Sequence, residues 1–142
     1  EVQAALAEAG IAAEPTPFSP LGLRLAGRAD AARLAPLADG RAEVQDEGSQ
    51  LLALALGARR DETVVDFCAG AGGKTLALGA QMRGTGRVLA FDVAGARLAA
   101  LAPRLAASGL GNVHTALLGG LADERLGRLA GKADRVLVDA PC

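Results

Sequence analysis

The chain has 142 residues, of which 51% are hydrophobic, and its formal net charge at pH 7 is −1. A mean hydropathy of +0.27 indicates a globular domain with a genuine core and excludes a disordered chain. The balance of 15 basic and 16 acidic residues gives no electrostatic support for nucleic-acid binding, but it does not exclude it. No apolar run approaches the roughly 18 residues of a membrane span, and the sequence shows neither a basic n-region nor a signal-type apolar segment. We therefore expect no membrane association, a cytoplasmic location, and a chain that is a piece of a longer protein.

Residues 1–44 are predicted to form part of a small α+β subdomain or linker, and we assign no chemistry to them. The local predictions are a helix over 2–9, a proline-rich loop over 15–20, a strand over 21–25 and a helix over 30–37. Asp30 is the predicted N-cap of the last helix. Pro36 lies near the predicted end of that helix, which is expected to stop before it.

The domain that carries function is expected over residues 45–142. It begins with a polar segment, Gln45 to Gln50, that leads into an apolar helical pattern over 51–56. Ser49 is the predicted N-cap of this helix, and Gly57 is predicted to end it. The polar residues are interpreted here as helix-capping residues.

From residue 63 onward, strand and helix patterns alternate along the chain. The predicted strands cover about 63–67, 87–92, 113–118 and 134–139, and the predicted helices about 73–82, 95–107 and 121–130. Pro103 predicts a kink or an interruption in the second of these helices. Such alternation predicts an α/β, Rossmann-like fold with a parallel sheet, cut after the fourth strand. Ligands of such sheets bind beyond the carboxyl ends of the strands, where Asp66, Asp92 and Asp139 are expected.

The stretch TVVDFCAGAGGKT, residues 63–75, predicts a buried strand, a glycine-rich turn and a helix that begins near Gly73. A phosphate-binding P-loop requires glycine where Cys68 stands, and a dinucleotide fingerprint requires its third glycine where Thr75 stands. The pattern of S-adenosylmethionine (SAM) methyltransferases fits without a mismatch: an acid at the strand end, Asp66, followed by small residues and G-x-G. We therefore expect SAM as the cofactor.

Two further sites are in register with this loop. Asp92 ends the second strand, where a carboxylate can accept hydrogen bonds from both hydroxyls of an adenosine ribose; its alternative role is a helix N-cap. Asp139 ends the fourth strand and is followed by Ala-Pro-Cys142. A thiolate is a suitable nucleophile for C6 of a pyrimidine, and its addition makes C5 reactive towards a methyl donor. Taken alone, Cys142 is more often a small buried apolar residue, but its position after Asp-Ala-Pro at a strand end favours the chemical role.

Together, DFCAGAGGKT, the FDV at Asp92, DAPC and the lead-in VQDEGSQLLA resemble the Sun/Fmu family of RNA cytosine-5 methyltransferases. The bacterial members that modify small-subunit ribosomal RNA are the most similar in kind. The resemblance covers about residues 44–142 and implies a SAM-dependent enzyme that forms 5-methylcytosine in RNA, with ribosomal RNA as partner and no metal. It implies that the methionine part of SAM is lined by Cys68, Ala69, Gly70, Ala71, Gly72, Gly73 and Lys74. It also implies that Asp92 holds the ribose and that Asp139 lies near the reacting groups.

The resemblance assigns Cys142 to release of the methylated product and places the covalent nucleophile in a later motif. Because the sequence stops at Cys142, we expect the fragment itself to be inactive. DNA cytosine methyltransferases instead use a Pro-Cys thiol as nucleophile, so the chemistry alone leaves the role of Cys142 open. The family's adenine-contacting acid is replaced by Gly119-Gly120, with Asp123 as the candidate substitute. The only histidine, His114, is interpreted as structural.

Two functions from other classes remain as alternatives. The first is a P-loop-type nucleotide-binding protein that uses Gly73-Lys74-Thr75, which would require Mg²⁺ for ATP or GTP binding. The second is a non-catalytic module that binds SAM or RNA and only positions a partner. Binding measurements with nucleotide and cofactor, and methylation assays, would discriminate between these functions.

Overall fold

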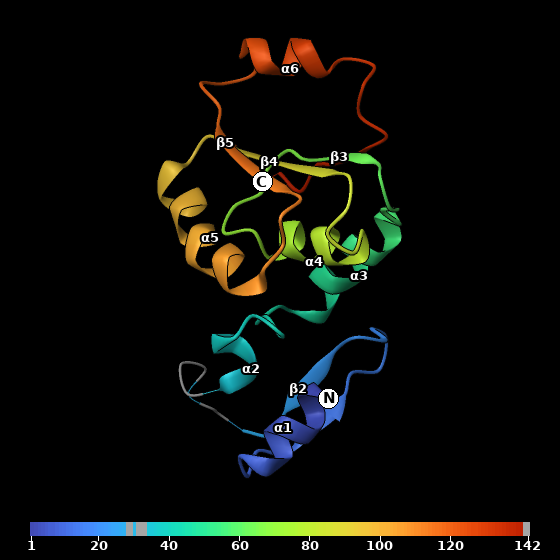
Figure 1. Ribbon diagram of the computed structural model, residues 1–142, viewed down its shortest axis with the longest axis vertical. Helices are drawn as coiled ribbons and strands as arrows, with labels where there is room; N and C mark the ends of the chain where they lie inside the picture. Colours follow the sequence, from blue (N-terminus) through green and yellow to red (C-terminus); the bar gives the residue numbers. More distant parts are fainter. Residues whose placement is uncertain (28–29, 31–33, 141–142) are drawn as a thin grey trace.

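The computed structural model describes residues 1–27, 30 and 34–140, which form the two stacked parts visible in Figure 1. The N-terminal part contains a two-stranded antiparallel sheet, and the remainder contains a four-stranded parallel sheet with helices on both faces. The N-terminal elements are α1 (Val2–Glu8), β1 (Ala13–Pro15), β2 (Leu23–Leu25) and α2 (Ala35–Ala38). The others are α3 (Glu47–Leu56), β3 (Thr63–Asp66), α4 (Gly73–Gln81), β4 (Arg87–Asp92), α5 (Gly95–Ser108), β5 (Val113–Leu117), α6 (Glu124–Leu129) and β6 (Arg135–Leu137).

The N-terminal part differs from the sequence prediction in two places. The predicted proline-rich loop contains a strand, β1, which pairs antiparallel with β2. Pro15 is tolerated there because a strand in a two-stranded sheet has an outer edge that needs no backbone donor. For the helix predicted over 30–37, the predicted N-cap, Asp30, and the predicted end before Pro36 are both wrong. Residues 31–33 lie outside the described residues, and α2 begins only after Leu34, with Pro36 in its first turn, where the fixed φ of proline suits a helix.

The helix α3 begins four residues before the predicted 51–56. Its N-cap is Asp46, whose carboxylate accepts a hydrogen bond from the backbone N–H of Ser49 at 3.0 Å. The prediction of Ser49 as N-cap was therefore wrong, because Asp46 satisfies the helix's first free N–H groups one turn earlier. Gly57 ends the helix in the left-handed conformation, as predicted.

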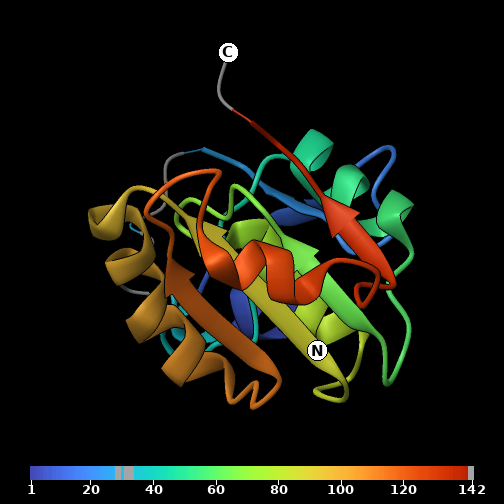
Figure 2. The same ribbon diagram turned by 90° about the horizontal axis from the view of Figure 1, so that it is seen from above.

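The parallel sheet has the strand order β5-β4-β3-β6, which confirms the predicted α/β, Rossmann-like class. The chain moves outward from β3 through β4 to β5 and then returns to the other side of β3 to form β6. Right-handed crossovers require that such a reversal places the connecting helix on the opposite face. Figures 1 and 2 show this: α4 and α5 lie on one face of the sheet and α6 lies on the other.

Helix α5 contains Pro103 and continues without interruption to Ser108. Of the predicted kink or interruption, the interruption is therefore absent. Pro103 removes the N–H that would bond to the carbonyl of Ala99, and both residues are exposed, so that carbonyl can be hydrated. Leu98 and Leu101 are buried on the other side of the helix and hold it against the sheet.

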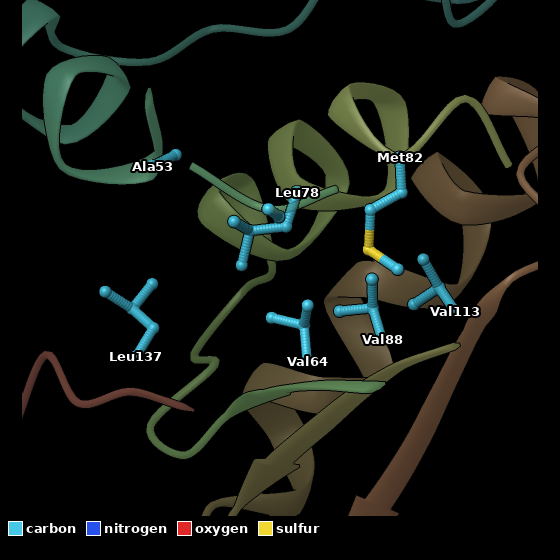
Figure 3. Packing of buried hydrophobic residues seen from close by; sticks show 8 residues of the cluster. Ala53, Val64, Leu78, Met82, Val88, Val113 and Leu137 are labelled. Carbon is cyan, nitrogen blue, oxygen red and sulfur yellow. The ribbon is translucent and has the colours of Figure 1, made fainter. Parts of the chain in front are cut away.

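The main core lies between the sheet and the helices α3 and α4 (Figure 3). Leu78 and Met82 from α4 are fully buried, and they pack on Val64 and Val88 from the two central strands. The residue that follows Val64 along β3, Val65, points to the other face, where it packs with Phe91 under α6. This alternation is the two-residue period of a strand buried on both faces.

Strand β6 lies at one edge of the sheet and, within the described residues, pairs only with β3. Val136 and Val138 are 51% and 60% exposed at this edge. We predict self-association of the chain through β6, because a free strand edge offers unpaired backbone groups. In the described ranges, no helix has both the length and the apolar character needed to cross a bilayer.

We predict that Leu78→Ala lowers the free energy of unfolding by about 2–5 kcal/mol, because it leaves a cavity in the tightly packed centre of the core. Leu52→Ala is the matched control: Leu52 is on α3 but 49% exposed, and its loss is expected to cost less than about 1 kcal/mol. Urea unfolding followed by circular dichroism measures both values. Equal costs for the two variants would contradict this description of the core.

Candidate active site

The glycine-rich loop between β3 and α4 is closed at its base by a buried side-chain hydrogen bond. The hydroxyl of Thr75 donates to the Asp66 carboxylate at 2.7 Å, and the two residues are 0% and 1% exposed. This bond joins the last residue of β3 to the first turn of α4. It therefore fixes where the intervening loop begins and ends.

Gly72 is the N-cap of α4 and needs to be glycine for two reasons. Its φ is +86°, a conformation that residues with a Cβ rarely adopt. A Cβ at this position would also lie 2.3 Å from a methyl carbon of Leu101 on α5. Because no side chain caps α4, the N–H groups of its first turn are left for another acceptor.

A cavity of about 290 Å³ opens at this helix N-terminus. Six of the seven loop residues predicted to surround the cofactor line it: Cys68, Ala69, Ala71, Gly72, Gly73 and Lys74. Gly70, the seventh, does not line it. The remaining lining residues are Val44, Gln45, Asp46, Ser49 and Asp66. The cavity is thus enclosed by the glycine-rich loop on one side and by the start of α3 on the other.

The segment Val44–Ser49 was missed as part of the site by the sequence analysis. It carried a signal, the polar run QDEGSQ, which was interpreted only as helix-capping. Asp46 does cap α3, but together with Ser49 it also lines the cavity. One side chain therefore serves both purposes.

Asp92 lies beside the cavity at the end of β4 and is 6% exposed. One of its carboxylate oxygens accepts from the N–H of Gly70 at 2.8 Å, and the other accepts from the N–H of Ala94 at 2.7 Å. Burial raises the pKa of this carboxyl, but these N–H groups outweigh it and lower the pKa below its usual value. The N-cap of α5 is Ala94, so the alternative role of Asp92 as helix N-cap does not apply. Its two bonds leave further lone pairs free for a ligand's hydroxyl groups.

Lys74 connects the glycine-rich loop to the residues that follow β6, the strand on the other side of β3 from β4. Its ammonium lies 2.6 Å from the carboxylate of Asp139, which follows β6, and its side chain is 17% exposed. Asp66 lies nearby: burial raises the pKa of its carboxyl, whereas the Thr75 hydroxyl and the Lys74 charge lower it to a smaller extent. The positive charge of Lys74 therefore offsets two neighbouring carboxylates.

Cys68 has a half-buried, free thiol at the cavity wall. Burial raises its pKa, and the carboxylates of Asp92, Asp66 and Asp139 raise it further. At neutral pH the side chain is therefore a thiol and a poor nucleophile. Cys142, the other predicted site cysteine, lies outside the described residues.

Arg104 on α5 holds the site together from outside, and no sequence signal indicated it. Its guanidinium donates to the carbonyl oxygen of Ala71 at 2.5 Å and forms an ion pair with Glu43 at 2.6 Å. These partners are 33 and 61 residues away along the chain. Arg104 thereby joins α5, the glycine-rich loop and the segment that leads into α3.

Asp123, the candidate substitute for an adenine-contacting acid, forms hydrogen bonds and an ion pair with neighbouring residues of the chain. Its carboxylate caps α6, accepts from the N–H of Gly119 at 3.0 Å and pairs with Arg125 at 2.6 Å. Hydrogen bonds from Arg125 and from the backbone hold its pKa far below the usual range. These contacts keep both carboxylate oxygens of Asp123 occupied. His114 is exposed on β5.

Across the described part of the chain, no group of three or more His, Cys, Asp or Glu residues is arranged to hold a metal ion. The cavity is lined by the uncapped first turn of α4, one ammonium, two carboxylates, an amide, a hydroxyl, a thiol and several small or apolar residues. Such a set suits an organic ligand that carries a carboxylate or hydroxyl groups.

We predict that Asp66→Asn becomes progressively more stable relative to the unsubstituted chain as the pH rises. The pKa of Asp66 is raised in the folded state, so the folded chain binds this proton more tightly than the unfolded chain. Protonated Asp66 therefore stabilises the folded state fully below its ordinary pKa of 3.8, and this contribution is lost as the pH rises through the raised pKa. Unfolding in urea between about pH 3.5 and pH 7 measures the difference.

Asp39→Asn is the control with the opposite sign. The Arg41 guanidinium lowers the pKa of Asp39, so this carboxylate favours the folded state above its ordinary pKa, and that contribution disappears as the pH falls. A stability difference for Asp66→Asn that stays flat across the pH range would contradict the buried position of its carboxyl.

Comparison with known proteins identifies the family. The 16S rRNA methyltransferase RsmB/F family matches residues 53–142. The probable ribosomal RNA small subunit methyltransferase B of Synechocystis is 34% identical over the whole chain, which covers 32% of that protein. The 28S rRNA (cytosine(4447)-C(5))-methyltransferase of Homo sapiens is 33% identical over 72% of the chain, which covers 12% of that protein.

Among solved structures, that of NSun6 from Pyrococcus horikoshii with SFG superposes with a TM-score of 0.71 and 25% identity. This match covers 88% of the chain and 33% of that protein. The chain thus spans about a third or less of each of these proteins. It belongs to the 16S rRNA methyltransferase RsmB/F family.

Proposed function

We propose that the protein to which this chain belongs is a SAM-dependent methyltransferase that forms 5-methylcytosine in RNA, with ribosomal RNA as its substrate. The observation that carries the proposal is the cavity at the N-terminus of α4, which is enclosed by the DFCAGAGGK loop and flanked by Asp92 and Asp139. Family membership and the names of the relatives support RNA as the substrate and C5 of cytosine as the methylated atom.

The residues around the cavity fit SAM. The uncapped first turn of α4 would hold the carboxylate of its methionine part, since a helix N-terminus favours an anion. Asp92 would accept from the ribose hydroxyls with the lone pairs that its backbone bonds leave free. The relative from Pyrococcus horikoshii was solved with SFG, an analogue of SAM, which supports this choice of cofactor.

The reaction divides between cofactor and protein in a simple way. Bound SAM supplies an electrophilic methyl group. The protein must hold a cytosine beside it and make C5 of that base nucleophilic, which addition of a cysteine thiolate to C6 achieves. Asp139 would lie near this centre, with its position set by its ion pair with Lys74. Cys142 follows three residues later and would assist release of the product. Cys68 remains protonated and would serve only as part of the cavity wall.

The arrangement around Thr75 disfavours the P-loop alternative. In a P-loop the Ser or Thr after the lysine gives its hydroxyl oxygen to Mg²⁺. Here the Thr75 hydroxyl is fully buried and donates to Asp66, and Lys74 is paired with Asp139. Neither side chain is positioned to bind a nucleotide's phosphates together with a metal ion.

We predict that S-adenosylhomocysteine binds the 142-residue chain and that Asp92→Ala weakens this binding by about 1.5–3 kcal/mol, the contribution of hydrogen bonds to a charged group. Calorimetric titration measures both affinities. Asp39→Ala is the control, because it removes an exposed, ion-paired carboxylate from the N-terminal part. Equal affinities for the two variants would contradict the assignment of Asp92 to the cofactor.

Methyl transfer by the full-length protein separates an enzyme from a module that only binds. The expected product of incubation with SAM and ribosomal RNA is 5-methylcytosine, detected by mass spectrometry of the digested RNA. RNA binding without methylation would instead support the non-catalytic alternative.

A further inference from the structure

The loop that joins β1 to β2, residues 16–22, displays an aromatic side chain to solvent. Phe18 is 75% exposed, although the chain has only three phenylalanines and neither tryptophan nor tyrosine. A single exposed apolar residue needs no explanation by itself. The way in which this loop is held does need one.

The loop is fixed at its base and at its tip. The N–H of Thr16 donates to the carbonyl oxygen of Gly22 at 2.9 Å, which continues the hairpin beyond β1 and β2. At the tip, the backbone N–H groups of Phe18 and Ser19 both donate to one carboxylate oxygen of Glu47, at 2.6 and 2.7 Å.

A side-chain hydrogen bond between Ser19 and Gln50 also fixes the tip of the loop. Ser19 is 3% exposed, and its hydroxyl donates to the side-chain oxygen of Gln50 at 2.7 Å. Pro17 and Pro20 flank Phe18 and Ser19 and restrict the backbone further. The backbone that carries Phe18 is therefore preorganised, which lowers the conformational cost of a contact made by its ring.

This loop lies next to the candidate active site. Glu47 is the first residue of α3 and follows Asp46, which lines the cofactor cavity together with Ser49 on the same turn. Figures 1 and 2 show the hairpin beside α3, while α6 covers the opposite face of the sheet. The helix that forms one wall of the cavity therefore also carries the support for Phe18.

We propose that Phe18 stacks on an unpaired base of the RNA substrate and positions it at the entrance of the site. This inference rests on the RNA methyltransferase function proposed above and adds a substrate-contacting residue from the N-terminal part. Aromatic stacking is the usual way in which proteins hold splayed or single-stranded bases.

The first test measures RNA affinity with the 142-residue chain and a single-stranded RNA of about 12 nucleotides. Phe18→Ala is expected to weaken binding roughly 5- to 150-fold, the range for loss of one stacked base. Phe18→Leu keeps the apolar surface without an aromatic face, and we expect it to weaken binding similarly. Phe18→Tyr is expected to bind as the unsubstituted chain does. Leu121→Ala is the matched control, because Leu121 is an apolar residue that is 84% exposed in the loop between β5 and α6.

The second test uses the absence of tryptophan from the chain. In the Phe18→Trp variant the introduced indole is the sole tryptophan fluorophore, and stacking on a base is expected to quench its emission as RNA is added. The Leu121→Trp variant, with its indole equally exposed in the loop between β5 and α6, is expected to show no quenching.

The outcomes separate this inference from the function on which it rests. RNA binding that Phe18→Ala and Phe18→Leu leave unchanged, or an indole at position 18 that RNA does not quench, overturns the stacking role alone. Failure of the unsubstituted chain to bind RNA also overturns the stacking role. Failure to bind S-adenosylhomocysteine, or absence of methyl transfer by the full-length protein, contradicts the proposed function itself. Because Phe18 is largely exposed, none of its substitutions is expected to unfold the chain.

Discussion

The buried hydrogen bond between Thr75 and Asp66 is the interaction on which the rest of the site depends. It connects the end of a central strand to the first turn of α4 and so sets the length and path of the glycine-rich loop between them. A buried carboxylate is costly unless it is hydrogen-bonded, and this one keeps its pKa raised even with the Thr75 hydroxyl and Lys74 nearby. The positions of the loop's small residues follow from this closure.

Three carboxylates, those of Asp66, Asp92 and Asp139, surround the loop, and their charges explain several of its properties. All three raise the pKa of Cys68, which keeps that thiol protonated. Lys74 pairs with one of them, and backbone N–H groups stabilise another. An excess of negative charge suits a cofactor whose reactive centre is a cation, and this agrees with the proposal of SAM, a sulfonium.

The N-terminal part supports the site rather than simply preceding it. Glu43 is held by Arg104, whose guanidinium also binds the glycine-rich loop, and Glu47 holds the tip of the β1–β2 hairpin. The division of the chain at residue 44 therefore falls within a segment that contacts both parts. The two-domain description stays a prediction about sequence organisation, while the side-chain contacts join the two parts at the cavity.

Local sequence patterns were sufficient to predict the strands and helices of the α/β part, because the periodicity of apolar residues within each segment indicates its secondary structure. Alternating apolar runs predicted β3, β4, β5 and β6 to within a few residues, and the small residues after Asp66 predicted the glycine-rich turn that lines the cavity. Several errors arose where a neighbouring residue competed for a role. Asp46, not Ser49, caps α3, and the helix around Pro103 continues because packing on its other face outweighs one lost hydrogen bond.

The strand order and the contacts across the site were decided only by the tertiary structure. After β5 the chain returns to the other side of β3, and no local pattern encodes this change in strand order. The placement of β6 beside β3, and with it the pairing of Lys74 with Asp139, depends on it. The contacts of Arg104 and the support of Phe18 by Glu47 join residues 29 to 61 positions apart. The sequence by itself determined where strands end and turns form, because these features depend on the local backbone preferences of the residue types present there. Their assembly into one cavity depends on how the elements pack, which becomes fixed only when the whole core forms.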